Sequence, residues 1–286
     1  MNKTPSPNRQ HGLDWLETLI FTLKDGTKMI DTLNAQTAID LTDWHAWHLS
    51  RNRDAISRTG ATSLSATEWI SATSLKDAHT FPSLPGKWYQ RGGGVVGAHL
   101  PPAFATTGTV QIHPGELLVA GDVTLTVFER LGQYALQIFD ARNPQRFEFH
   151  SIATFPPSDE WRIDARFFPE PDTVNSAAAD GVIVATPTAG WVHFLKDRVD
   201  YRLRVTVQGN NLRALFSDNS SQLGVYQHRF VDIPRPDTHG NTVIDFNRAY
   251  LPPKALNKKF LCPSPSLNNH LNLSVQAGEK WVVAGA

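Results

Sequence analysis

The feature that most constrains the fold is an alternation of apolar and polar residues in short runs between turn-forming residues. Val123, Leu125 and Val127 alternate with threonines. After a turn that contains Gly132, the alternation resumes in the run 134–138. A period of two residues places the apolar side chains on one face of a β-strand. Two such runs with a short turn between them predict a β-hairpin.

The same pattern recurs further along the chain. Apolar residues alternate in 201–207 and again in 212–216, on either side of the turn signal Gly-Asn-Asn at 209–211. Another alternating strand is predicted over 161–167. Short strands with Gly, Pro and Asn between them are typical of antiparallel sheets closed into a sandwich or a barrel. We therefore predict a mainly β fold of that class.

The first 80 residues have a different pattern, which favours helices. Apolar residues recur at helical spacing in 13–26 and again in 41–56. The segment FPSLPG, at 81–86, then interrupts the pattern. We predict an N-terminal helical segment over 1–80 that packs on one β domain over 81–286.

Charge and cysteine content exclude several classes of function. The chain has 27 Lys and Arg against 27 Asp and Glu, so it lacks the overall basic charge that attracts nucleic acid or an anionic membrane. The single cysteine, Cys262, forms neither an internal disulfide nor a thiolate metal site by itself. No apolar run approaches the roughly 20 residues that cross a bilayer, and the N-terminus lacks the apolar core of a signal peptide. We expect a cytoplasmic protein that binds neither nucleic acid nor a membrane.

Two short motifs invite a cofactor or metal interpretation that their context does not favour. RGGGVVG, at 91–97, lacks the Lys-Ser/Thr of a phosphate-binding loop and leads into valines, so we interpret it as a turn before a strand. His45 and His48 are three residues apart on an expected helix, but no further metal ligands accompany them. The sequence indicates no cofactor and no metal.

The densest polar cluster lies in VIDFNRAYLPPKAL, at 243–256. If the strand runs through Asn247, then Asp245 and Asn247 share one face about 7 Å apart, and the apolar residues beside them pack on the other face. The double proline that follows cannot donate ladder hydrogen bonds and ends the strand. Arg248 carries five rigid donors that suit a carboxylate or a phosphate.

This cluster supports two interpretations. In the first, Arg248 holds a small anion while Asn247 and Asn269 orient it, in a pocket that Asp245 and Tyr250 also line. In the second, Arg248 pairs internally with Asp245 or with Glu279, and the cluster is a hydrogen-bonded structural corner.

Three further residues are candidates for chemistry in such a pocket. Tyr226 or His270 would transfer a proton. Cys262 would be a nucleophile if a cation or an imidazole lowered its pKa. The alternative for Cys262 is burial as a small hydrophobic residue.

The C-terminal motifs also carry a family resemblance. DFNRAY with LPP, CPSPSLNNHL and VQAGEK resembles the closing signature of an uncharacterised prokaryotic family, domain of unknown function 1684. The resemblance extends over about Leu84 to Lys280 and includes Asp218, Tyr226 and Arg229. It implies a predominantly β fold, and no established activity comes with it. Lys254 stands where the family usually has a cysteine, so a mechanism that needs two cysteines is lost here.

The leading functional hypothesis is that the protein binds a small polar or anionic molecule in a pocket near the DFNRAY segment. Whether it also transforms that molecule as an enzyme is left open, as is its oligomeric state. The alternative is a noncatalytic β module for protein–protein interaction or assembly. An exposed apolar patch that contains Trp88, Trp161 or Trp191 would favour that alternative.

Overall fold

The computed structural model describes residues 15–16, 39–178, 180–265 and 267–285. These residues form mainly antiparallel β-sheets, which confirms the predicted fold class. The expected helix over 13–26 lies outside the described residues apart from Trp15 and Leu16, both buried. In the part of the chain that the structure describes, no helix is both long enough and apolar enough to cross a membrane.

The helices within the described residues are α2 (Leu41–Ala55), α3 (Pro144–Glu148) and α4 (Pro253–Leu256). The strands that precede residue 160 are β1 (Leu64–Ile70), β2 (His79–Phe81), β3 (Leu84–Arg91), β4 (Gly94–Ala98), β5 (Thr109–Ile112), β6 (Leu117–Ala120), β7 (Val123–Arg130), β8 (Gln133–Asp140) and β9 (Phe149–Thr154). The strands that follow are β10 (Arg162–Ala177), β11 (Ile183–Lys196), β12 (Val199–Gln208), β13 (Asn211–Asp218), β14 (Arg229–Ile233), β15 (Asn241–Asp245), β16 (His270–Leu271) and β17 (Glu279–Ala284).

The chain divides into two compact units, and each unit combines segments that are distant in the sequence. The half-barrel unit comprises the described residues of 1–49, 152–255 and 261–281, and the sandwich unit comprises those of 50–151, 256–260 and 282–286. The predicted boundary near residue 80 does not coincide with this division. Within the segment 1–80 that is predicted to be helical with loops, Leu64–Ile70 forms the strand β1, which pairs with β8.

The sandwich unit contains two four-stranded sheets, in the orders β1-β8-β7-β6 and β2-β3-β4-β5. Apolar residues from both sheets, among them Trp88 and Leu125, form one core. The predicted hairpin is confirmed as β7 and β8. RGGGVVG is confirmed as a turn, since Gly92 and Gly93 join β3 to β4 with φ of 59° and 79°, the backbone that a two-residue hairpin turn requires.

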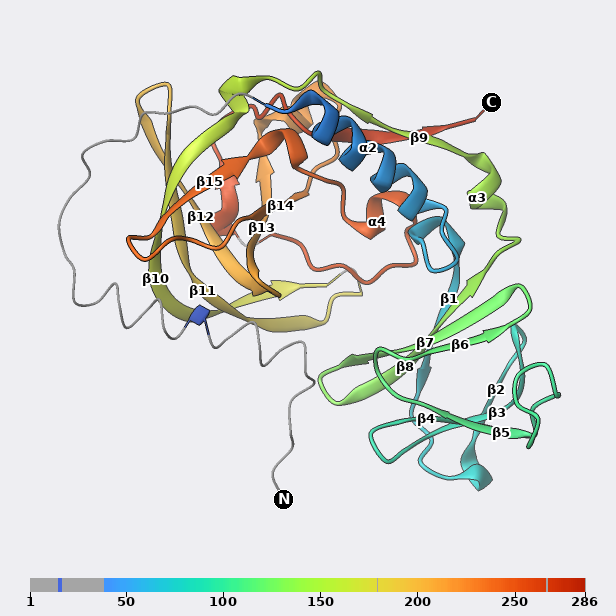
Figure 1. The fold of residues 1–286 in the computed structure, drawn as a ribbon. Helices are drawn as coiled ribbons and strands as arrows, with labels where there is room; N and C mark the ends of the chain where they lie inside the picture. The colour runs from blue at the N-terminus through green and yellow to red at the C-terminus, as the bar shows by residue number, and fades with distance from the viewer. Residues whose placement is uncertain (1–14, 17–38, 179, 266, 286) are drawn as a thin grey trace. The chain divides into compact units, whose positions relative to one another are not determined.

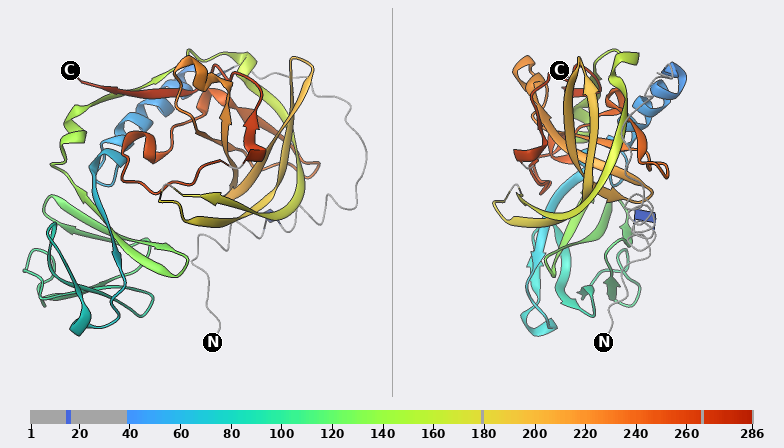
Figure 2. Two further views of the ribbon diagram at one scale, coloured as in Figure 1. Left: turned by 180° about the vertical axis from the view of Figure 1, so that it is seen from behind. Right: turned by 90° about the vertical axis from the view of Figure 1, so that its left-hand side faces the viewer.

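The half-barrel unit is built on one curled sheet in the order β14-β13-β12-β11-β10-β15, and β16 pairs with β13. Figure 1 shows the long strands β10 and β11 bending strongly, with β12, β13 and β14 continuing the curl, and Figure 2 shows the same strands from two further directions. The two end strands, β14 and β15, approach each other. The predicted hairpin is confirmed as β12 and β13.

The concave core of this unit takes the inward residues of each strand. The predicted apolar face at 161–167 is confirmed, with Phe167 1% exposed, and Ile244 and Phe246 are fully buried in the same cluster. Phe246 packs edge-on against the rings of Trp161 and Phe216. This apolar anchor holds the polar cluster at 245–248 at one end of the sheet.

Candidate functional site

The strand that carries the polar cluster ends earlier than the sequence predicts. β15 stops at Asp245, and 246–248 form a 3-10 turn instead of continuing the strand to Asn247. The Asp245 carboxylate accepts a hydrogen bond from the Asn247 amide at 3.1 Å and caps the turn. The strand therefore ends where the Asp245 side chain caps the turn, several residues before the double proline that was predicted to end it.

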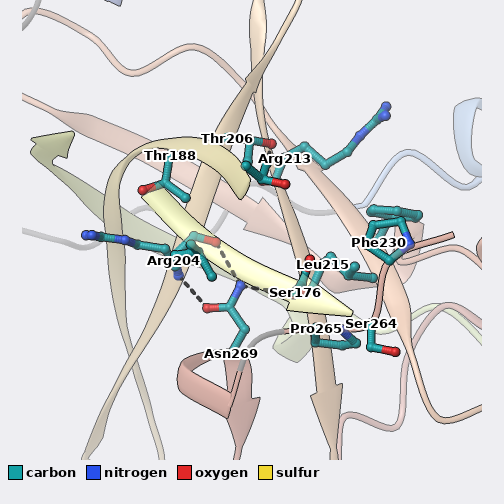
Figure 3. A pocket seen from close by; sticks show the side chains of 13 residues that line it. Ser176, Thr188, Arg204, Thr206, Arg213, Leu215, Phe230, Ser264, Pro265 and Asn269 are labelled. Carbon is teal, nitrogen blue, oxygen red and sulfur yellow. Dashed lines mark hydrogen bonds between the residues drawn. The ribbon is translucent and has the colours of Figure 1, made fainter. Parts of the chain in front are cut away.

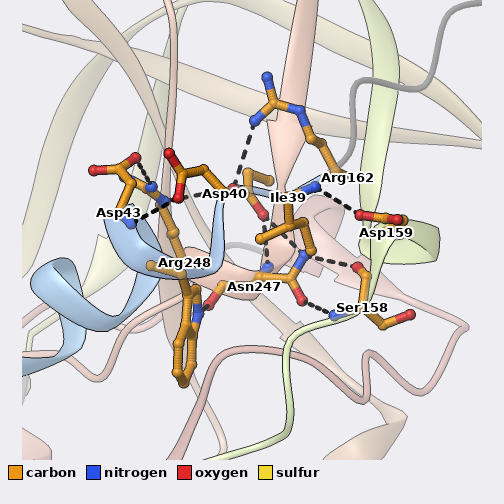
Figure 4. Close-up of polar contacts among 10 residues, drawn as sticks. Ile39, Asp40, Asp43, Ser158, Asp159, Arg162, Asn247 and Arg248 are labelled. Carbon is orange, nitrogen blue, oxygen red and sulfur yellow. Dashed lines mark hydrogen bonds and ion pairs between the residues drawn. The ribbon is translucent and has the colours of Figure 1, made fainter.

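Asn247 is fully buried, and its side chain forms hydrogen bonds with protein groups. Its Oδ1 accepts from the Ser158 amide at 2.9 Å, and its Nδ2 donates to the Ser158 carbonyl and to Asp245 Oδ1, each at 3.0 Å. The indole Nε1 of Trp44, on α2, donates to the Asn247 carbonyl at 3.0 Å. Figure 4 shows Asn247 facing Ser158, with these contacts drawn as dashed lines. The Asn247 side chain therefore has a structural role, because it links the 246–248 turn to the backbone of Ser158.

Arg248 is also paired within the protein. Its guanidinium forms an ion pair with Asp43, in the first turn of α2, and a longer one with Asp245 at 3.5 Å (Figure 4). Arg162 approaches the same Asp245 carboxylate at 3.8 Å. Arg248 thus pairs internally with Asp245, as in the second interpretation of the sequence. Its other partner, Asp43, is not indicated by the sequence.

Arg229 organises the other C-terminal motifs into a buried network, here called the clasp. Its side chain is 1% exposed, and its Nη2 donates to Asp218 Oδ1 at 3.0 Å and to the Val275 carbonyl at 2.9 Å. Its Nη1 donates to the Ala277 carbonyl at 2.5 Å. Burial lowers the pKa of Arg229, and the Asp218 carboxylate opposes that effect.

Glu279 connects the clasp to the DFNRAY segment. Its carboxylate is fully buried and accepts a hydrogen bond from the Leu251 amide at 2.7 Å, while its own amide donates to the Ala249 carbonyl at 2.8 Å. The preceding Gly278 has φ of 75°, and a Cβ there would lie 2.4 Å from the Ala249 carbonyl oxygen. Only glycine fits that close approach. The motifs NRAYL and VQAGEK are therefore one packed structural unit.

The other predicted pocket residues lie apart from one another. The Tyr250 hydroxyl is 3.3 Å from Asp232 Oδ1, and its ring packs on Phe230. The Asn269 side chain bonds the backbone of Arg204: its Oδ1 accepts from the Arg204 amide at 2.7 Å, and its Nδ2 donates to the Arg204 carbonyl at 2.8 Å. Each of the predicted binding residues is held by internal partners, and of the following four only Asn269 lines either of the two pockets described below. Those residues are Asn247, Arg248, Tyr250 and Asn269.

A pocket of about 490 Å³, here called the polar pocket, opens immediately after the DFNRAY segment. Two of the predicted catalytic residues, Tyr226 and Cys262, are brought together here. The third, His270, lies on β16, where its Nδ1 is 3.0 Å from Ser217 Oγ, and it is not part of this lining. The pocket is lined by Ser221, Gly224, Val225, Tyr226, Gln227, His228, Pro252, Lys254, Cys262, Pro263 and Ser264.

Burial and Lys254 set the protonation of the polar pocket. Burial raises the pKa of the Cys262 thiol, and the amide and ammonium of Lys254 oppose this increase. Burial, followed by the charge of Cys262, raises the pKa of Tyr226. Burial, followed by the charge of Lys254, lowers the pKa of His228. At neutral pH the lining therefore presents a thiol, a phenol and a neutral imidazole around one ammonium group.

Two residues of this pocket are not recognised from the sequence. Lys254 enters there only as a departure from the family pattern, and His228 receives no role. A local signal for Lys254 does exist, since it follows the double proline directly and a proline pair fixes the path of the chain. No local signal links either residue to Cys262.

A second pocket, here called the sheet pocket, lies across the face of the curled sheet that is turned away from the core. In Figure 3, Thr188 and Arg204 lie on one side of this pocket, and Phe230 and Pro265 lie on the other. Its volume is about 140 Å³, and it is lined by Val174, Ser176, Thr186, Thr188, Arg204, Thr206, Arg213, Leu215, Phe230, Pro263, Ser264, Pro265 and Asn269.

The three tryptophans named for an interaction module are buried. Trp88 is 0% exposed, Trp161 6% and Trp191 9%. Trp88 belongs to the core of the sandwich unit and Trp161 to the core of the half-barrel unit. Trp191 lies beneath the guanidinium groups of Arg202 and Arg204. These residues therefore give no exposed apolar patch.

The fold and the clasp define an antiparallel half-barrel domain whose C-terminal motifs are part of its interior. Residues 147–280 match the model of the family described as "Protein of unknown function (DUF1684)". The resemblance seen in the sequence is thereby confirmed over these residues. The match begins well downstream of Leu84, where the resemblance was expected to start.

A partial likeness to solved structures is also present. The solution NMR structure of an uncharacterised protein from Haloarcula marismortui is 26% identical and has a TM-score of 0.40. The similarity covers 47% of this chain and 78% of that chain. No curated protein matches the sequence.

Proposed function

We propose that this protein binds a small polar or anionic molecule in the polar pocket. The observation that carries the proposal is the lining: one ammonium group, from Lys254, is surrounded by neutral hydrogen-bonding groups, and none of the described residues of the lining is a carboxylate. A single uncompensated cation in a partly enclosed pocket favours an anion over a cation. The volume of about 490 Å³ lies within the range of small-molecule sites.

Each polar side chain has a role in this proposal. Lys254 supplies the charge that attracts the anion, as a mobile ammonium with three donors. The Tyr226 hydroxyl donates or accepts a hydrogen bond. His228, neutral at pH 7 because burial lowers its pKa, donates from one ring nitrogen and accepts at the other.

Binding is favoured over thiol catalysis at this site. The thiolate is the nucleophilic form of cysteine, and burial raises the pKa of Cys262 and so reduces the thiolate fraction. His228, whose pKa is lowered, supplies no imidazolium to stabilise a thiolate. Cys262 acts in this proposal as a packed wall of the pocket.

The test is a titration of the full chain, labelled with ¹⁵N, with acetate, inorganic phosphate and, as a cationic probe, ethylammonium. We expect acetate or phosphate to shift the amide resonances around Lys254 with a saturable dependence on concentration, and ethylammonium to leave them unchanged. Lys254→Gln should weaken anion binding at least about tenfold, since it removes the one charge of the lining.

The matched control is Lys258→Gln, because Lys258 is an exposed lysine that follows closely in the sequence and does not line the pocket. It should bind the anions as tightly as the unmodified protein. Saturable binding of equal strength in both variants would refute the proposal.

A further inference from the structure

The polar pocket and the sheet pocket share a wall. Pro263 and Ser264 line both of them. This wall is fixed to the sheet, because the Ser264 amide donates to the Ala177 carbonyl at 3.0 Å and Pro263 forms a β-bridge with Ala178. The two pockets are therefore neighbours across one short, anchored segment of chain.

A second segment also passes along both pockets. His228 lines the polar pocket, and Phe230, two residues further on, lines the sheet pocket. His228 immediately precedes β14, which begins at Arg229, and two residues of chain span at most about 7 Å. Arg229, between them, turns inward to the clasp. Both pockets are therefore lined by neighbouring positions at the start of β14.

The sheet pocket differs from the polar pocket because the charged side chains in its lining are paired with carboxylates. Its two arginines are both neutralised: Arg213 holds Asp232 through two contacts of 2.6 and 3.0 Å, and Arg204 holds Glu170 at 3.1 Å and Asp172 at 2.7 Å. The remaining lining consists of threonine, serine and asparagine side chains and of valine, leucine, proline and phenylalanine surfaces. The volume of about 140 Å³ is close to that of an apolar cavity of roughly 150 Å³ that accepts a benzene ring.

Lys254 differs from those two arginines. Among the described residues it has no carboxylate partner, so its charge is available to a ligand. One compartment thus offers a cation, and the adjacent compartment offers a ring-sized space whose two arginines are already paired with carboxylates. A ligand that fills both must carry an anionic group and a ring-sized apolar group.

We propose that the two pockets are compartments of one bipartite site, and that its ligand is a small carboxylate joined to a flat apolar ring by a short chain. This inference rests on the proposed function, because it assigns the anionic group to Lys254. The ring occupies the sheet pocket, against Phe230 and Leu215, and the linker crosses the wall at Ser264. Because His228 and Phe230 are two residues apart, their Cα atoms are separated by at most about 7 Å, which corresponds to a linker of about three or four atoms.

The probes follow from this geometry. 4-Phenylbutanoate carries both groups, butanoate carries the anionic group alone, and 4-phenylbutan-1-ol carries the ring without the charge. Dissociation constants for the full chain come from ¹⁵N chemical-shift titrations. We expect 4-phenylbutanoate to bind at least about tenfold more tightly than either partial probe, since burying a phenyl ring contributes at least that factor.

The decisive variant fills the sheet pocket. Thr186 lies on β11 with its side chain in the lining, and it makes no side-chain hydrogen bond to any described residue. Thr186→Phe should raise the dissociation constant of 4-phenylbutanoate to that of butanoate and leave butanoate binding unchanged. Ala185→Phe is the matched control, because residue 185 is exposed, precedes Thr186 on the same strand and does not line the pocket.

The outcomes separate this inference from the proposed function. If Lys254→Gln weakens butanoate and 4-phenylbutanoate alike while Thr186→Phe affects neither, the anion site stands and the bipartite site is refuted. If Lys254→Gln leaves both carboxylates bound as before, both proposals fail. If neither carboxylate binds while phosphate does, only the bipartite site is refuted. If Thr186→Phe and Ala185→Phe weaken the binding of 4-phenylbutanoate equally, the effect arises from a disturbance of the strand, and the bipartite site is also refuted.

Discussion

Replacing Asn247 with alanine tests whether the most polar segment of this chain is a structural corner. The side chain is fully buried and makes three hydrogen bonds, of 2.9, 3.0 and 3.0 Å, to Ser158 and Asp245. Each such bond contributes about 1 kcal/mol net, and the amide and carbonyl of Ser158 are left in a partly buried position. We expect the free energy of unfolding to fall by about 3 kcal/mol in Asn247→Ala.

Asn247→Asp sharpens the same prediction. It preserves the shape and the acceptor for the Ser158 amide, but it replaces both donated hydrogen bonds with a carboxylate beside Asp245. Like charges in contact disfavour ionisation, so the loss of stability should be at least as large at neutral pH and smaller at low pH, where one carboxyl is protonated. A loss that did not depend on pH would contradict the position of Asp245 beside this side chain.

The control is the adjacent Arg248→Ala. The Arg248 side chain is 34% exposed and pairs with Asp43, which is 63% exposed, so solvent screens the interaction. Exposed ion pairs contribute about 0–1 kcal/mol, and we expect a change within that range. Urea unfolding followed by circular dichroism and tryptophan fluorescence measures both variants. A cost for Asn247→Ala no larger than that for Arg248→Ala would refute the structural interpretation.

Three further predictions concern the clasp and the polar pocket. Arg229→Ala leaves the Asp218 carboxylate buried without its cation. It should lower the free energy of unfolding, measured by thermal denaturation, by about 3–5 kcal/mol, which is more than the loss of an exposed ion pair would cause. The pKa of His228 is lowered by burial and by Lys254, so below about pH 6.5 the unfolded chain binds a proton that the folded chain does not. The free energy of unfolding should therefore decrease as the pH falls below that value, and it should decrease less steeply in His228→Gln. Urea midpoints measured at about pH 7 and pH 5 test this. The raised pKa of Cys262 predicts slower alkylation by iodoacetamide at about pH 7.5 than a free thiol shows, and slower still in Lys254→Gln; reaction at the rate of free cysteine would contradict this.

The strands of this protein are predictable where their signals are local. Hairpins such as β7–β8 and β12–β13 depend on alternation within a few residues and on turn residues between the runs. The turn at Gly92 and Gly93 is equally local, since two positive φ angles in succession favour glycine. The sequence misses β1 because its strand state depends on pairing with β8, which lies far along the chain.

The candidate site depends on contacts that no local pattern records. The sequence alone marks 245–248 as an unusual polar cluster, but the partners that hold it, Ser158 and Asp43, are 89 and 205 residues away in the chain. Likewise, Tyr226 and Cys262 are each singled out by the sequence, and only the folding of separate segments places them beside Lys254 in one pocket. Residue types determine which groups can donate, accept or carry charge. Tertiary contacts between segments far apart in the sequence determine which of those groups form hydrogen bonds or ion pairs within the protein and which are left facing a cavity.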